Sequence, residues 1–252
     1  MKIFLKYILL FISISGFSQS PKEFAKSVPE SISQNPKSLA QYFRNAFPDD
    51  NDFVESFYIW TTTNIKYTNE TVDSLSDYDL VRYVLTTKSG KCKHFSALFT
   101  CICNMAGVEA YSVLGYVKLN NDIETTQDHA WNVIKIQNKF YLYDPTWDSG
   151  KDTVQYYKKN GSEFISTHMP YDPMMQLQKY PVSHTKYFKG KLQGRHIFDY
   201  NSALEEYKNL DAESQLKILL FRAEEYDINN FKLDFLYIRL KHFVKDYTDF
   251  EF

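Results

Sequence analysis

The stretch HAWNVIKIQNKFYLYDPTWD, residues 129–148, predicts a β-hairpin. Two runs rich in β-branched and aromatic residues, 129–136 and 139–147, flank Gln137 and Asn138, which suit a short turn between antiparallel strands. A two-residue turn places His129 and Asp144 on the same face as diagonal neighbours, with Cβ atoms about 7 Å apart. A carboxylate and an imidazole can hydrogen-bond across that gap. A register shifted by one residue would put them on opposite faces, so the pair depends on the turn.

A helix is predicted upstream, in GKCKHFSALFTCICNMAG, residues 90–107. From Phe95 its apolar residues recur with a period of 3.6, and Gly107 supplies a helix stop. Cys92 falls just before the first turn. A thiol in that place feels the helix dipole and the unpaired N–H groups, and both favour the thiolate.

The chain has 3 cysteines. Cys101 and Cys103 lie two positions apart on the predicted helix and point to different sides, so they cannot easily pair with each other. We expect both to be small buried hydrophobes. Cys92 is then the unpaired thiol, which in an exported protein is a candidate reactive group.

The first 18 residues, MKIFLKYILLFISISGFS, have the composition of a secretory signal peptide. Lys2 and Lys6 precede a mostly apolar run that ends in small residues. That run is shorter than the roughly 20 apolar residues that a membrane-spanning helix needs. We therefore expect an exported protein, periplasmic or secreted, without stable membrane insertion.

Composition indicates a packed globular protein. Of 252 residues, 44% are apolar and 17% aromatic, which excludes a disordered or collagenous chain. The formal net charge of -2 gives no reason to expect a nucleic-acid partner.

The pattern of elements predicts an α+β protein with a helical C-terminal extension. We expect a signal peptide at 1–18, a lead-in and first helix at 19–49, a catalytic domain at 50–190 and the extension at 191–252. The expected helices are 38–47, 50–65, a short piece at 79–85, 202–226 and 230–246, and a further strand is expected at 108–119. Residues 154–188 are expected to be rich in loops.

Three of these residues together suggest acyl chemistry. Cys92 would be the nucleophile, His129 the general base and acid, and Asp144 the group that orients the imidazole. Amides of the first helical turn could stabilise an oxyanion. Each residue also has an ordinary interpretation, because a lone histidine on a strand is more often structural and an aspartate before Pro145 can simply start a turn.

The helix and hairpin sequences, taken in order, closely resemble the transglutaminase-like superfamily, and in particular its kyphoscoliosis-peptidase-like group. The resemblance rests on Gly-Lys-Cys at the helix start, His-Ala-Trp-Asn on one strand and Asp-Pro-Thr-Trp-Asp after the next, and it covers roughly residues 50–150. The segment EFISTHMPYDPMMQLQKYPVS, residues 163–183, also looks like the one that follows in that group. The resemblance implies a papain-like core of N-terminal helices and an antiparallel sheet, with Cys92, His129 and Asp144 as the triad.

One departure concerns the residues after the thiol. Relatives commonly carry an acidic residue and a glycine there, whereas this chain has Lys93 and His94. Lys91 and Lys93 would favour the thiolate, although a solvated lysine pair is an equal alternative. Candidate walls of a substrate site are Trp131, Asn132, Trp147, Lys93 and His94.

The remaining polar residues do not suggest a metal site. No pair of possible ligands has zinc spacing, and we expect neither a metal nor another cofactor. His168, in the loop-rich segment, is expected to make a structural hydrogen bond rather than to contact the site.

Three functions fit this set of residues. Hydrolysis of amide bonds in a protein or peptide substrate is preferred, and protein cross-linking through the same thioester is the alternative. A non-catalytic module that binds peptides or cell-wall partners in the same groove is the third. No residue separates water from an amine as the acceptor, and the oligomeric state is not readable.

Overall fold

The structure is a computed structural model that describes residues 20–70, 77–120, 122–229 and 234–248. The expected signal peptide at 1–18 lies outside the described residues. Among the described residues, no helix has the length and apolar character needed to cross a membrane.

The N-terminal part is a small bundle of helices. α3 (Pro36–Ala46) and α4 (Asp50–Asn64) confirm the two helices expected there. The lead-in differs from the prediction, because it contains two short helices, α1 (Pro21–Lys26) and α2 (Glu30–Ser33). Each begins at or directly after a proline, which is well placed in a first turn because no amide hydrogen is needed there.

The predicted thiol-bearing helix is α6 (Cys92–Met105), and the expected piece before it is α5 (Asp77–Thr87). Between them, β2 (Ser89–Gly90) pairs in parallel with β1 (Lys66–Tyr67). The apolar face of α6 is buried against the N-terminal helices. This face and the N-terminal bundle therefore form one core cluster.

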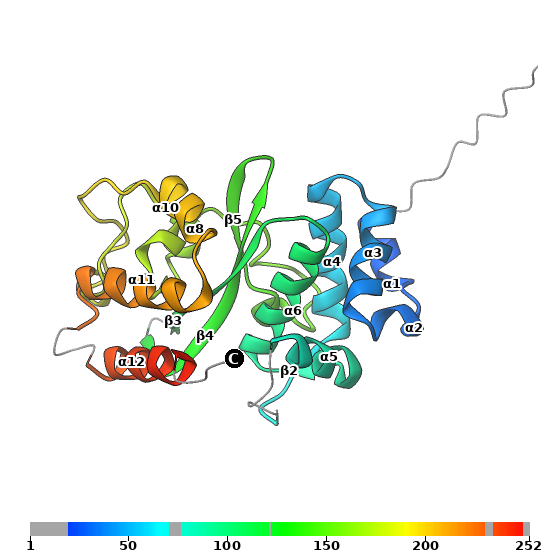
Figure 1. Ribbon diagram of the computed structural model, residues 1–252, viewed down its shortest axis with the longest axis horizontal. Helices are drawn as coiled ribbons and strands as arrows, with labels where there is room; N and C mark the ends of the chain where they lie inside the picture. The colour runs from blue at the N-terminus through cyan, green and yellow to red at the C-terminus, as the bar shows by residue number, and fades with distance from the viewer. Residues whose placement is uncertain (1–19, 71–76, 121, 230–233, 249–252) are drawn as a thin grey trace, which may run out of the picture.

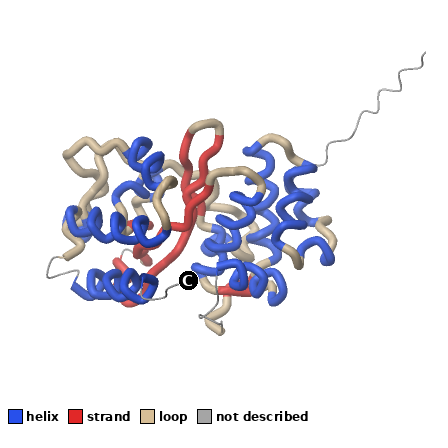
Figure 2. Tube along the Cα trace, in the orientation of Figure 1, coloured by secondary structure: helices blue, strands red, loops and turns tan. Residues whose placement is uncertain are grey.

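A four-stranded antiparallel sheet follows, in the order β5-β4-β3-β6. The expected strands are confirmed as β3 (Ala110–Leu119), β4 (Asp122–Ile136) and β5 (Lys139–Tyr143). β6 (His168–Pro170) comes from the segment expected to be loop. Figure 2 shows the strands running between two groups of helices.

The predicted hairpin register is confirmed. Gln137 and Asn138 have φ of 50° and 63°, which is the left-handed conformation that a tight hairpin turn requires. Ile136 accordingly pairs with Lys139.

The second hairpin strand is shorter than expected. It ends at Tyr143 instead of continuing to 147, and a short helix, α7 (Pro145–Asp148), takes its place. Pro145 has no amide hydrogen for a strand ladder but suits the first position of a helix.

The C-terminal part covers the opposite face of the sheet (Figure 1). Its apolar residues pack against side chains of β3, β4 and β5 and form two further core clusters with them. The helices are α8 (Gly161–Phe164), the 3-10 turn η1 (Pro173–Gln176), α9 (His184–Phe188), α10 (Tyr200–Tyr207), α11 (Ala212–Glu225) and α12 (Asp234–Thr248). The α+β class and the helical C-terminal extension are thus as expected, with a break between α10 and α11.

Candidate functional site

Cys92 is the first residue of α6, and the chain reaches it through a closely packed turn. A Cβ on Gly90 would lie 2.5 Å from Cβ of His94, so only glycine fits there. His94 is fully buried, and its Nδ1 accepts a hydrogen bond from the Lys91 amide at 3.3 Å. The packing of His94 under Gly90 therefore fixes the backbone that presents the thiol.

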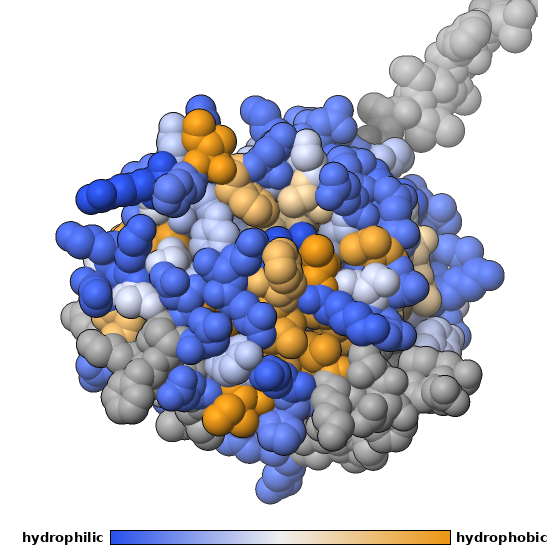
Figure 3. Space-filling view, turned by 60° about the vertical axis from the view of Figure 1, so that its left-hand side comes forward, coloured by the Kyte–Doolittle hydropathy of each residue, from blue (hydrophilic) through white to orange (hydrophobic). Residues whose placement is uncertain are grey.

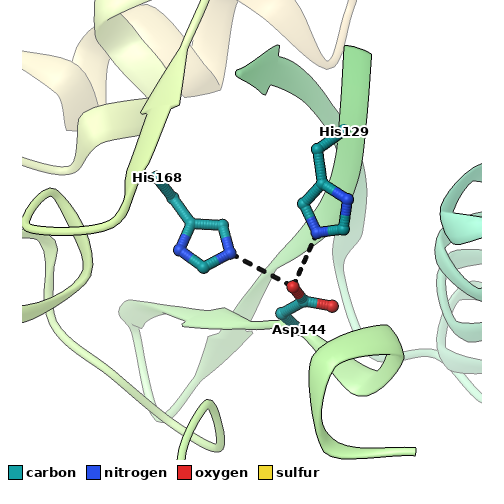
Figure 4. A group of neighbouring side chains, drawn as sticks. All are labelled: His129, Asp144 and His168. Atoms are coloured by element: carbon teal, nitrogen blue, oxygen red, sulfur yellow. Dashed lines mark hydrogen bonds and ion pairs between the residues drawn. The ribbon is translucent and has the colours of Figure 1, made fainter. Parts of the chain in front are cut away.

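The structure brings His129 and Asp144 together, as the hairpin register requires. Nε2 of His129 donates to Oδ2 of Asp144 at 2.7 Å (Figure 4). The other oxygen of Asp144 accepts the amides of Thr146 at 2.9 Å and Trp147 at 3.0 Å. The carboxylate is thus both the N-cap of α7 and the hydrogen-bond partner of the imidazole.

A second imidazole completes this arrangement. His168 on β6 is fully buried, and its Nε2 donates to Oδ2 of Asp144 at 3.1 Å. Its Nδ1 lies 2.8 Å from the hydroxyl of Thr167. Burial is the largest influence on His168 and lowers its pKa to about 4, despite the nearby carboxylate. His168 is therefore a neutral donor at neutral pH.

The ring of His129 lies beside the thiol of Cys92, where its charge and a hydrogen bond lower the pKa of the thiol. Because Nε2 is taken by Asp144, Nδ1 is the nitrogen left for the sulfur. Sγ also lies 4.0 Å from the carbonyl oxygen of Asp128. The imidazole thus lies between the thiol and the carboxylate, and it binds the carboxylate at 2.7 Å.

The electrostatics of this chain favour an ion pair. Burial is the largest influence on Cys92 and raises its pKa, but the hydrogen bond and charge of His129, with a backbone hydrogen bond at Ala130, lower it below the ordinary value. Burial likewise lowers the pKa of His129, but Asp144 and Cys92 outweigh it and raise that pKa to about 10. Asp144 keeps its charge because the two imidazoles lower its pKa against the effect of burial. Both shifts favour the form in which a Cys92 thiolate lies beside a His129 imidazolium.

The two hairpin tryptophans differ in exposure. Trp131 is fully buried, and its ring centroid lies 5.1 Å from that of His168. The indole of Trp131 has room because the neighbouring residue on β3 is Gly115. A Cβ at that position would lie 2.6 Å from the indole. Trp147 is half-buried, with its ring 5.4 Å from His129 and 4.4 Å from His168.

Two further candidate wall residues lie where α6 meets the sheet: Asn132 on β4 and Lys93 in α6. The side chain of Asn132 is buried and donates to the carbonyl of Ser96 and to the hydroxyl of Thr100, both at 2.9 Å. It links β4 to the helix and does not contact the thiol directly. Lys93 is half-buried at the edge of a groove beside α6.

Ligand atoms of His129, Asp144 and His168 all lie within 4.8 Å of one another, as metal ligands do. Each Nε2, however, donates its proton to the same carboxylate oxygen. Neither nitrogen offers a lone pair while it does so. The short distances are therefore explained by hydrogen bonds to a charged carboxylate.

Residues 37–145 match the model of the transglutaminase-like superfamily. This segment contains the helix with Cys92 and the hairpin with His129 and Asp144, so the resemblance drawn from those motifs is confirmed. This part of the chain is therefore similar to the transglutaminase-like superfamily.

Two curated proteins and one solved structure are similar to parts of this chain. The kyphoscoliosis peptidases of Mus musculus and Homo sapiens are 29% and 28% identical over 154 residues, which cover 53% of this chain. The match spans only 23% of the length of either relative. The periplasmic domain of TgpA from Pseudomonas aeruginosa aligns with a TM-score of 0.40 at 22% identity, over 51% of this chain and 47% of that one.

Proposed function

We propose that this chain is an exported thiol enzyme that hydrolyses amide bonds in protein or peptide substrates. The observation that carries the proposal is the order of three groups: the Cys92 thiol at the start of α6, the His129 ring beside it, and the Asp144 carboxylate that binds this ring at 2.7 Å. The catalytic unit is residues 50–190, with 191–252 as its extension. The composition of residues 1–18 supports a periplasmic or secreted location.

In the proposed reaction, the Cys92 thiolate attacks the carbonyl carbon of the amide bond. The amide of Cys92 is the first of α6 and has no intrahelical acceptor, so it can donate to the oxyanion. His129, held by Asp144, gives its proton to the leaving amine and leaves a thioester. Water then attacks the carbonyl carbon of the thioester while His129 takes up its proton. The C–S bond breaks, the carboxylic acid product leaves, and the thiolate and imidazolium are restored.

His168 acts in this scheme as a positioning residue. It is neutral and donates to the Asp144 oxygen that also binds His129. The second donor holds that oxygen in place and keeps the carboxylate ionised. The imidazole of His129 is thereby fixed in one orientation and one tautomer.

Incubation with casein, with and without a labelled primary amine, tests the reaction type. We expect smaller fragments and no amine incorporation, because water resolves the thioester. Cys92→Ala is the control and should abolish fragmentation, since no acyl-enzyme can form. Amine incorporation without fragments would instead assign acyl transfer, and fragments that persist in Cys92→Ala would exclude the triad as their source.

A further inference from the structure

A groove of about 710 Å³ runs along α6 between the two halves of the molecule. Its floor is formed by β3 and β4, one wall by α5 and α6, and the other wall by α10 and α11 of the C-terminal extension. On the face shown in Figure 3, apolar side chains gather in a hollow near the middle, bordered by hydrophilic ones. The groove has the volume of a small-molecule or side-chain site.

One end of this groove lies beside the proposed catalytic residues, although neither Cys92 nor His129 is among the residues that line it. Lys93 and Ala130, which line it, directly follow Cys92 and His129 in the chain. The thiol itself is hydrogen-bonded to the backbone of Ala130. Ser96, also in the lining, lies one helical turn after Cys92 on the same stripe of α6. A substrate bound at the thiol can therefore extend directly into the groove.

The lining is mainly apolar, and much of this character comes from α11. Leu216 and Leu219 line the groove together with Leu114 of β3 and Val81 of α5. These two α11 residues lie outside the segment that carries the transglutaminase-like motifs. The extension therefore adds a wall that the domain alone does not have.

Two ion pairs fix the position of the C-terminal extension, one from α11 and one from α12. Arg222 of α11 binds buried Asp172 through hydrogen bonds of 2.6, 2.9 and 3.0 Å. Arg239 of α12 binds Asp128 at 2.6 Å. Asp128 directly precedes His129 in the chain. The extension is thus anchored to the strand that carries the imidazole.

We propose that the C-terminal extension is the specificity wall of the site, and that Leu216 and Leu219 select substrates with a large apolar side chain beside the reacting amide bond. This inference rests on the proposed thiol chemistry at Cys92. The substrate class is then a peptide with an aliphatic or aromatic residue next to the bond that is cleaved, with its side chain in the groove along α6.

Two alkylating probes with one reactive group test this. We expect N-phenethyl iodoacetamide to modify Cys92 at least about tenfold faster than iodoacetamide, with both rates normalised to glutathione, because burial of the phenyl ring favours the encounter. Leu219→Glu should slow the modification of Cys92 by N-phenethyl iodoacetamide about tenfold. It should change the rate with iodoacetamide by less than about twofold. Phe221→Glu is the matched control, because Phe221 is on the same helix, 54% exposed and outside the groove lining. It should change neither rate.

Ala212→Trp gives a second variant that does not bury a charge. Ala212 is an exposed residue of the lining, and a tryptophan there should fill the groove and slow only the phenethyl probe. The inference is overturned if the two probes modify wild-type Cys92 at equal normalised rates, or if both variants slow both probes equally. If Cys92 reacts with neither probe in the folded protein, the proposed thiol chemistry itself fails.

Discussion

Replacing Asp144 with asparagine is expected to slow substrate turnover by about four orders of magnitude while the protein stays folded. The asparagine Oδ1 can still accept the amides of Thr146 and Trp147, so the cap of α7 is kept. The amide nitrogen that replaces Oδ2 cannot accept the Nε2–H groups of His129 and His168. The imidazole of His129 then loses its orientation and its counter-charge.

Asp148→Asn is the matched control for this variant. Asp148 is also a fully buried carboxylate of the same turn, but its partners are the hydroxyl of Tyr58 and the amides of Gln155 and Tyr156. It should lower the melting temperature without a comparable loss of turnover. If Asp144→Asn instead unfolds the protein and leaves the turnover of its folded fraction unchanged, Asp144 is only a cap.

Trp131→Ala is expected to cost about 3–5 kcal/mol of unfolding free energy. The indole is fully buried and packs against Phe164 and His168, so its removal leaves a cavity beside the sheet. Urea unfolding with a fixed m-value measures the change.

Trp147→Ala provides the comparison, because this ring is only half-buried. It should cost less stability, yet it should alter the reactivity of Cys92, since the ring lies 5.4 Å from His129. Equal losses of stability in the two variants would contradict the distinct positions of the rings.

Sequence alone predicted the geometry of the site wherever that geometry is local. The turn at Gln137 and Asn138 determines the hairpin register, so it also determines that His129 and Asp144 share a face. The apolar period of α6 and the glycine after it likewise placed Cys92 at a helix start.

Contacts that depend on packing between distant segments were not predictable in this way. His168 lies on a strand that ends at Pro170 and is too short to show alternation, so nothing local distinguished it from a loop histidine. The wall formed by α11 depends on ion pairs such as Arg222 with Asp172, residues that are 50 positions apart. His94 looked like a site residue beside Cys92, but the helix turns it into the core.

The central claim is that Cys92 is a thiolate held by His129, and the pH dependence of alkylation with mass mapping of each cysteine tests it most directly. Cys92 should react fastest and stay reactive below pH 7, because the hydrogen bond and charge of His129 lower its pKa. Cys103 is fully buried with a raised pKa and should be protected until the protein unfolds. Cys101 is half-buried rather than buried as the sequence predicted, so it should react in the folded protein but more slowly than Cys92. In His129→Gln the Cys92 profile should move to higher pH, since the imidazolium is lost. Equal labelling of the three thiols, or a Cys92 profile centred near the free-thiol pKa of about 8.5, would contradict the account.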